Sequence, residues 1–239
     1  MTTKEQMAAY LMERYQKEDM QSRLDREQFC ALFREAVKDF YPKLKKMYAD
    51  QTIYGISIEI GDVVQSVYKD SFVSYFYLNT EEQYQEQIKD CEEDEESDYR
   101  FGVWSEWDPV EAKSELFEKL QDYLTQNSLY ECTVLSSPSE LDYQKALGDA
   151  AVAWYNDNSS DFEDAFDEEC SEIRLWMAEA LGELRKEGFW EKQGNAELYV
   201  IPFDGECEIE TEELIETFLL MDAGCHGTEY IDYLESCDS

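Results

Sequence analysis

The sequence predicts an α+β protein in which helices pack on a mainly antiparallel sheet, with residues 1–239 forming a single domain. Strand-like patterns are grouped early in the chain, helical patterns are grouped later, and one more strand pattern returns near the C-terminus. The 239 residues are 43% hydrophobic and 14% aromatic, which is enough apolar material for a large core.

The N-terminal region is predicted to be helical. Its apolar residues recur at steps of three and four and so share one helix face: Phe29, Leu32, Phe33, Ala36, Val37 and Phe40. Asp25 and Gln28 resemble a capping box at the helix start. Pro42 is expected to kink or end the helix, and residues 1–24 are expected to form a peripheral N-terminal helix.

A β-hairpin is predicted next. In the stretch IYGISIEI, four residues alternate with smaller or polar ones, namely Tyr54, Ile56, Ile58 and Ile60. The Gly61-Asp62 pair supplies a turn, and a second strand-forming run extends from Val63 to Leu78.

Five consecutive carboxylates mark the next segment. A short helix is expected from Thr80, and residues 91–98 are predicted to be an exposed acidic loop because like charges repel one another. An alternation typical of a strand follows at Tyr99, Phe101 and Val103. Asp108 and Pro109 then predict a helix start, and the expected buried face of that helix comprises Leu116, Leu120, Tyr123 and Leu124.

The second half is predicted to be mostly helical. Helices are expected at about 140–155 and 162–187, with Gly188 as the C-cap of the second. The second helix should bury Ile173, Trp176, Met177, Ala180, Leu181 and Leu184. A strand at 197–203 and a short acidic helix at 212–221 complete the prediction.

The charge of the chain is strongly negative and unevenly distributed. It has 57 acidic and 20 basic residues, for a net charge of -37, and no Lys or Arg follows Lys192. Half of the basic residues lie in the first fifty positions. Nucleic acids and anionic membranes repel carboxylates, so direct binding to either is disfavoured. A basic protein partner, metal ions, or mimicry of a polyanion stay open.

The sequence indicates a cytoplasmic protein. The first residues lack an apolar signal-peptide core, and nowhere do eighteen apolar residues follow one another. The seven cysteines are odd in number and form no C-x-x-C pair, so reduced thiols are expected.

No complete catalytic or metal-binding signature is present, so we predict no catalytic residues, no metal and no cofactor. The only histidine, His226, is interpreted as an incidental loop residue, and a zinc site of the usual composition is not expected. Five residues from Asp157 to Glu168 match EF-hand ligand positions, but Phe162 stands where the turn needs glycine. A solvated helix start is the preferred interpretation of that segment.

Partner-binding candidates come from two acidic clusters and two tryptophans. Trp104 and Trp107 adjoin the acidic loop as anchor candidates, although two core tryptophans would give the same pattern. The acidic candidates are Glu92, Glu93, Asp94, Glu95 and Glu96 in the loop, and Asp161, Asp164, Asp167, Glu168 and Glu169 in the second cluster.

At YRFGVWSEW, and again at ALGELRKEGFW followed by ELYVIPFDGE, the chain resembles an uncharacterised bacterial family, the domain of unknown function forty-three-oh-three. The resemblance covers roughly residues 29–218. The residues that match its two signatures are Arg100, Trp104, Glu106 and Trp107, with compressed spacing, and Leu184, Arg185, Glu187, Gly188 and Phe189. The resemblance implies a single cytosolic domain and, because many members are encoded near polymorphic toxin genes, an immunity-type role.

The leading functional hypothesis is a non-enzymatic immunity protein that neutralises a basic toxin domain through an acidic face. Three alternatives stay open. The first is a nucleic-acid mimic that inhibits DNA- or RNA-binding proteins. The second is an enzyme or calcium-binding protein with an unrecognised carboxylate site. The third is a soluble protein whose acidity is an adaptation to salt or crowding.

Overall fold

The computed structural model describes residues 22–61, 73–91, 96–128, 149–203 and 209–237. In chain order the elements are α2 (Arg26–Met47), β1 (Ile53–Gly61), β2 (Val73–Thr80), α3 (Glu81–Gln87), η1 (Ile88–Asp90), α4 (Glu96–Phe101), α5 (Val103–Glu106), β3 (Asp108–Glu111), α6 (Glu115–Asn127), α9 (Asp149–Lys186), α10 (Phe189–Lys192), β4 (Tyr199–Val200), α11 (Thr211–Asp222) and α12 (Glu229–Cys237). The described part contains no helix that is long and apolar enough to span a bilayer.

The four strands form one sheet in the order β3-β2-β1-β4. β1 pairs with β2, and β2 with β3, in antiparallel fashion, whereas β4 adds to β1 in parallel. The predicted α+β class and the mainly antiparallel sheet are therefore confirmed.

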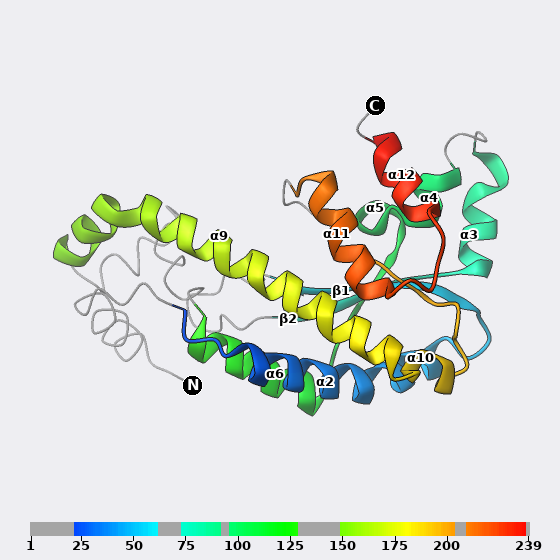
Figure 1. Ribbon diagram of the computed structural model, residues 1–239, viewed down its shortest axis with the longest axis horizontal. Coiled ribbons are helices and arrows are strands. Elements are labelled where there is room, and N and C mark those ends of the chain that lie inside the picture. The colour runs from blue at the N-terminus through cyan, green and yellow to red at the C-terminus, as the bar shows by residue number, and fades with distance from the viewer. Residues whose placement is uncertain (1–21, 62–72, 92–95, 129–148, 204–208, 238–239) are drawn as a thin grey trace.

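Helices cover both faces of this sheet (Figure 1). On one face, α2, α6, α9 and α10 enclose the larger apolar core, in which Phe40, Phe76 and Phe117 meet with ring centroids 5.2 to 5.9 Å apart. On the other face, α3, α4, α5, α11 and α12 enclose a second core that is rich in tyrosine. Alternate residues of each strand point to opposite faces, so Phe76 enters the first core and Tyr77 the second.

A β-bulge in β1 interrupts that alternation. The register with β2 shifts between Ile53 and Gly55. Ile53 and Ile56 consequently lie in the first core while Tyr54 turns into the second. An extra residue in one strand is a usual means of re-aiming a side chain, and here it places Tyr54 under the helices of the second face.

The predicted N-terminal helix is confirmed as α2. The Asp25 side chain accepts a hydrogen bond from the Gln28 backbone N–H at 2.8 Å, as the capping pattern predicts. Pro42, however, does not end the helix, which continues to Met47. Tyr41 and Leu44 are fully buried on either side of it, and their packing compensates for the hydrogen bond that proline cannot donate.

The prediction for residues 99–111 was wrong in both its parts. Tyr99 and Phe101 belong to α4 and Val103 to α5, rather than to a strand. The Asp108-Pro109 pair lies in β3 and does not start a helix. Pro109 is tolerated because β3 is an edge strand, where a missing N–H leaves no ladder bond unmade. The helix that follows instead begins after Ser114, whose hydroxyl accepts from the Phe117 N–H.

The two predicted late helices are one. α9 runs unbroken through the polar stretch near residue 160, so no EF-hand loop exists at 157–168. Its predicted buried face is confirmed, and Gly188 adopts a left-handed conformation (φ 67°) just after the helix ends.

The remaining predicted boundaries are partly confirmed. The Asp62 turn, residues 1–21 and the first part of the 140–155 helix lie outside the described residues. The predicted 197–203 strand is reduced to Tyr199 and Val200, and the 212–221 helix is confirmed as α11. Helix α12 was not predicted.

Gly182 fixes the distance between α9 and α11. A Cβ atom at this position would lie 2.1 Å from the backbone oxygen of Leu220, so the two helices approach too closely for any other residue.

Gly182→Ala should lower the free energy of unfolding by about 1–3 kcal/mol through overpacking, although alanine favours an isolated helix by about 1 kcal/mol. Urea unfolding measures the change. Gly227→Ala is the control because nothing lies within 4 Å of its Cβ position, and a more stable Gly182→Ala protein would contradict the contact.

Candidate functional site

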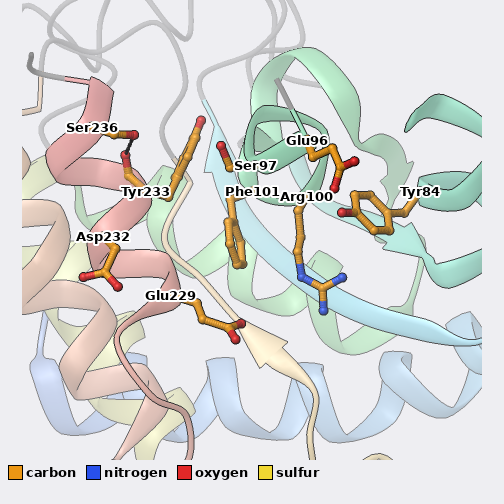
Figure 2. Close-up of a pocket in the computed structure, with 9 residues that line it drawn as sticks. All are labelled: Tyr84, Glu96, Ser97, Arg100, Phe101, Glu229, Asp232, Tyr233 and Ser236. Carbon is orange, nitrogen blue, oxygen red and sulfur yellow. Dashed lines mark hydrogen bonds between the residues drawn. The ribbon is translucent and has the colours of Figure 1, made fainter. Parts of the chain in front are cut away.

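An open pocket of about 650 Å³ lies on the second face, between α3, α4 and α12 (Figure 2). Three classes of side chain line it. The aromatic residues are Tyr84, Phe101 and Tyr233, the carboxylates are Glu96, Glu229 and Asp232, and the other lining residues are Ser97, Arg100 and Ser236.

Helical periodicity explains how α12 contributes to the pocket. Glu229, Asp232 and Ser236 are spaced by three and four residues and therefore share one face of the helix. Tyr230 and Leu234 lie on the opposite face and are buried in the second core. Because Tyr230 and Leu234 are buried in the second core, the acidic face of α12 is directed toward the pocket.

Among the described residues, Arg100 is the only basic one that lines the pocket, and its guanidinium is already engaged. Its Cζ lies 4.7 Å from the ring centroid of Tyr54 and 5.2 Å from that of Tyr84, both within cation–π range. A salt bridge of 3.8 Å joins it to Glu81. The Tyr54 hydroxyl also donates to the Arg100 backbone oxygen at 3.0 Å, so the bulge in β1 positions α4.

Tyr199, on β4, connects the sheet to α12 behind the pocket. Its hydroxyl donates to Glu229 Oε2 at 2.9 Å. Burial raises the pKa of Tyr199 to about 12, and the hydrogen bond to the Glu229 carboxylate raises it in the same direction. The tyrosine therefore stays neutral at physiological pH and fixes the Glu229 carboxylate as an acceptor.

The pocket has the chemistry of a receptor for a cationic group. Three carboxylates and one already paired guanidinium give it a net negative charge. Aromatic rings and carboxylates together bind ammonium and guanidinium groups, the rings through their faces and the carboxylates through charge-assisted hydrogen bonds.

The first predicted acidic cluster is only partly described. Glu92, Glu93, Asp94 and Glu95 lie outside the described residues, whereas Glu96 begins α4 and lines the pocket. The predicted exposed loop at 91–98 is therefore wrong at its C-terminal end, where the chain is helical from Glu96. The physical reason is Phe101, which is buried among aromatic rings and holds α4 against α12.

Trp107 is not an exposed anchor, and the alternative of a core tryptophan, which the same pattern allowed, applies to it. Its side chain is 4% exposed and packs edge-on against Tyr54 and directly over Gly55, where an added Cβ would lie 2.5 Å from the indole ring. The side chain of Trp104 lies outside the described residues.

The second predicted acidic cluster is not brought to the pocket. Asp161, Asp164 and Asp167 belong to α9, and their side chains lie outside the described part. Glu168 is exposed, whereas Glu169 is 2% exposed. The prediction is wrong for Glu169, because it lies on the inward side of the helix and cannot contact a partner.

Sequence reasoning missed the contributions of α3 and α12 to this site. Tyr84, Glu229, Asp232 and Tyr233 were not candidates, because the pocket exists only once helices far apart in the chain meet over the sheet. The signal for α12 was present in EYIDYLES, where Tyr230 and Leu234 are four residues apart and Asp232 lies between them.

Comparisons of the chain with protein-family models, with curated proteins and with solved structures find no match.

Truncation of Trp107 tests its structural role. Trp107→Ala should lower the free energy of unfolding by about 3–5 kcal/mol, because it empties a filled site between Gly55 and Tyr54. Thermal or urea unfolding measures the loss. Met47→Ala is the control, because Met47 is 63% exposed and its removal should change stability by less than about 0.5 kcal/mol. An equally small loss for Trp107→Ala would contradict the buried placement.

Tyr199 should make stability depend on alkaline pH. Its folded-state pKa, about 12, is raised above the value of about 10 expected in the unfolded chain. The stabilisation is therefore complete below pH of about 10 and is lost as the pH rises through about 12. Tyr199→Phe cannot ionise, so its free energy of unfolding should fall less steeply than that of the wild type across this interval. Urea unfolding at a series of pH values measures the two slopes, and equal slopes would refute the assignment.

Proposed function

We propose that this chain is a non-enzymatic cytoplasmic binding protein that neutralises a basic protein partner, most concretely a bacterial toxin domain. The observation that carries the proposal is the pocket between α3, α4 and α12, in which three carboxylates and three aromatic rings surround one open space. An Arg or Lys side chain of the partner is the group that such a space receives best.

The distribution of charge supports the same partner. α11 and α12 belong to the part of the chain after Lys192, which has no basic residue. A net charge of -37 accelerates encounter with a basic surface and disfavours acidic partners. The pocket supplies specificity at short range, and the surrounding charge supplies attraction at long range.

α11 carries an exposed apolar pair. Leu219 and Leu220, on α11, are 52% and 41% exposed. Glu212 and Glu216 on the same helix are also exposed. Apolar contacts surrounded by charged groups are typical of protein interfaces, so α11 is proposed to extend the contact area beyond the pocket.

The immunity role adds the biological context. It rests on the resemblance to family forty-three-oh-three, whose members are often encoded beside toxin genes. A toxin that binds nucleic acid needs a basic surface for phosphate, and an acidic inhibitor is complementary to that surface.

Growth rescue tests the proposal. Each gene that flanks this one is expressed alone and together with the protein, and the toxic product should become harmless in its presence. The triple variant Glu96→Gln/Glu229→Gln/Asp232→Asn keeps side-chain volume but removes three negative charges. Because each rim charge contributes up to about 1 kcal/mol, the variant should bind the purified toxin about tenfold or more weakly.

A matched control separates the pocket from overall charge. Glu118→Gln/Glu172→Gln/Glu191→Gln removes three exposed carboxylates from α6, α9 and α10 and should retain nearly full rescue. Flanking products that are equally harmless with and without the protein would refute the immunity role. Equal loss in both variants would refute the pocket, and competition with DNA for several unrelated DNA-binding proteins would favour nucleic-acid mimicry instead.

A further inference from the structure

The turn after α11 gathers three different metal-ligating side chains. Ala223 and Gly224 are both left-handed, with φ of 50° and 79°, and they reverse the chain within two residues. Asp222, Cys225 and His226 are thereby brought together, and one ligand atom of each lies within 4.8 Å of the others. Bonds of about 2.0–2.3 Å to a tetrahedral Zn²⁺ place ligand atoms about 3.3–3.8 Å apart, so small side-chain rotations suffice to surround one ion.

The orientation of these side chains is fixed by the backbone. Asp222 Oδ2 accepts a hydrogen bond from the His226 backbone N–H at 2.8 Å, and the Asp222 backbone oxygen accepts from the Cys225 N–H at 3.1 Å. Asp222 Oδ1 is left to face the imidazole ring. Asp222 Oδ2 therefore stabilises the turn through a hydrogen bond, and Oδ1 is the oxygen that can bind a metal ion.

Each ring nitrogen of His226 has an oxygen neighbour. Nε2 lies 3.1 Å from the Glu197 backbone oxygen, which can only accept, so a ring that makes this hydrogen bond donates from Nε2. Nδ1 faces Asp222 Oδ1 and then presents its lone pair to the space between the two side chains. A cation in that space is within reach of both atoms.

The surroundings provide no other compensating cation in the described part. Asp222 is 2% exposed, and an unpaired carboxylate at that depth is strongly disfavoured. The only salt bridge found for it joins it to His226. A metal-binding histidine usually donates its non-ligating ring N–H to a carboxylate, a backbone carbonyl or water, and the Glu197 backbone oxygen beside Nε2 is such an acceptor.

We infer that Asp222, Cys225 and His226 form a binding site for a divalent cation of the Zn²⁺ class. Asp222 Oδ1, Cys225 Sγ and His226 Nδ1 are the ligands, and water completes the tetrahedron. Mixed oxygen, sulfur and nitrogen ligands suit Zn²⁺ better than Ca²⁺ or Mg²⁺. Cys225 is exposed, so the ion has a route of entry, and binding releases the thiol proton and any proton on Nδ1 to solvent.

The site differs from the zinc sites that sequence motifs reveal. A single histidine and the absence of C-x-x-C spacing argued against a site of the usual composition, whereas here one residue of each type converges within five positions. The inference does not rest on the proposed function, because none of the three ligands lines the pocket.

Zinc and cobalt titrations test the site. The reduced full-length protein, stripped of metal, should bind one equivalent of Zn²⁺ in competition with a chromophoric chelator, with a Kd of about 1 µM or below. Co²⁺ should produce a thiolate-to-metal charge-transfer band. Cys225→Ser should abolish that band and weaken Zn²⁺ binding at least about tenfold, and His226→Gln should also weaken binding.

Controls keep the result interpretable. Cys237→Ser removes another exposed thiol, on α12, and should leave both readouts unchanged. Circular dichroism establishes that each variant is folded, and Cys225→Ser alone decides the matter if His226→Gln unfolds, because Cys225 is exposed. Absence of one-to-one binding, or wild-type Zn²⁺ affinity in Cys225→Ser, would overturn the inference.

Discussion

The fold depends on a sheet whose central strands are apolar on both faces. β2 places large aromatic or apolar side chains alternately above and below the sheet, as Phe76 and Tyr77 do, and β1 places Ile56 on one face and Tyr54 on the other. Burial of a single face would leave the other in water, so helices must cover both. The first layer is built from long helices, and the second from short ones. The pocket lies in the second layer, where several helix ends converge.

In the part of the chain that the structure describes, the basic side chains form most of their salt bridges on the first layer. Arg34, on α2, forms salt bridges with Glu183 and Glu187, and Arg26 bridges to Glu179. These salt bridges join α2 to α9 and to Glu187, just after α9. Without them the carboxylates of α9 would repel one another. Their exposure limits each to a modest contribution. Because half of the basic residues lie in the first fifty positions, the second layer keeps most of its negative charge, and this is the face proposed to bind a basic partner.

Much of the fold, but little of the site, could be predicted from the sequence. The stripe of α2 and the apolar face of α9 are long and periodic, and local pattern suffices for such elements. Residues 99–111 are short, and tertiary contacts decide their state: Phe101 is helical because it packs on α12, and Pro109 is extended because it pairs with β2. The pocket combines segments that are far apart in the chain, and no local pattern encodes their meeting.

Tyr199 belongs to two neighbourhoods at once. One face of its ring stacks on His226 with centroids 3.8 Å apart, while its hydroxyl holds Glu229 of the pocket. A ligand that displaces the Tyr199 ring, whether it binds at the Asp222 turn or in the pocket, also changes the surroundings of the other site. If both proposed sites are occupied, thermodynamic reciprocity requires the effect of the cation on partner affinity to equal the effect of the partner on cation affinity. Tyr199 is the side chain that physically links the proposed cation site to the pocket.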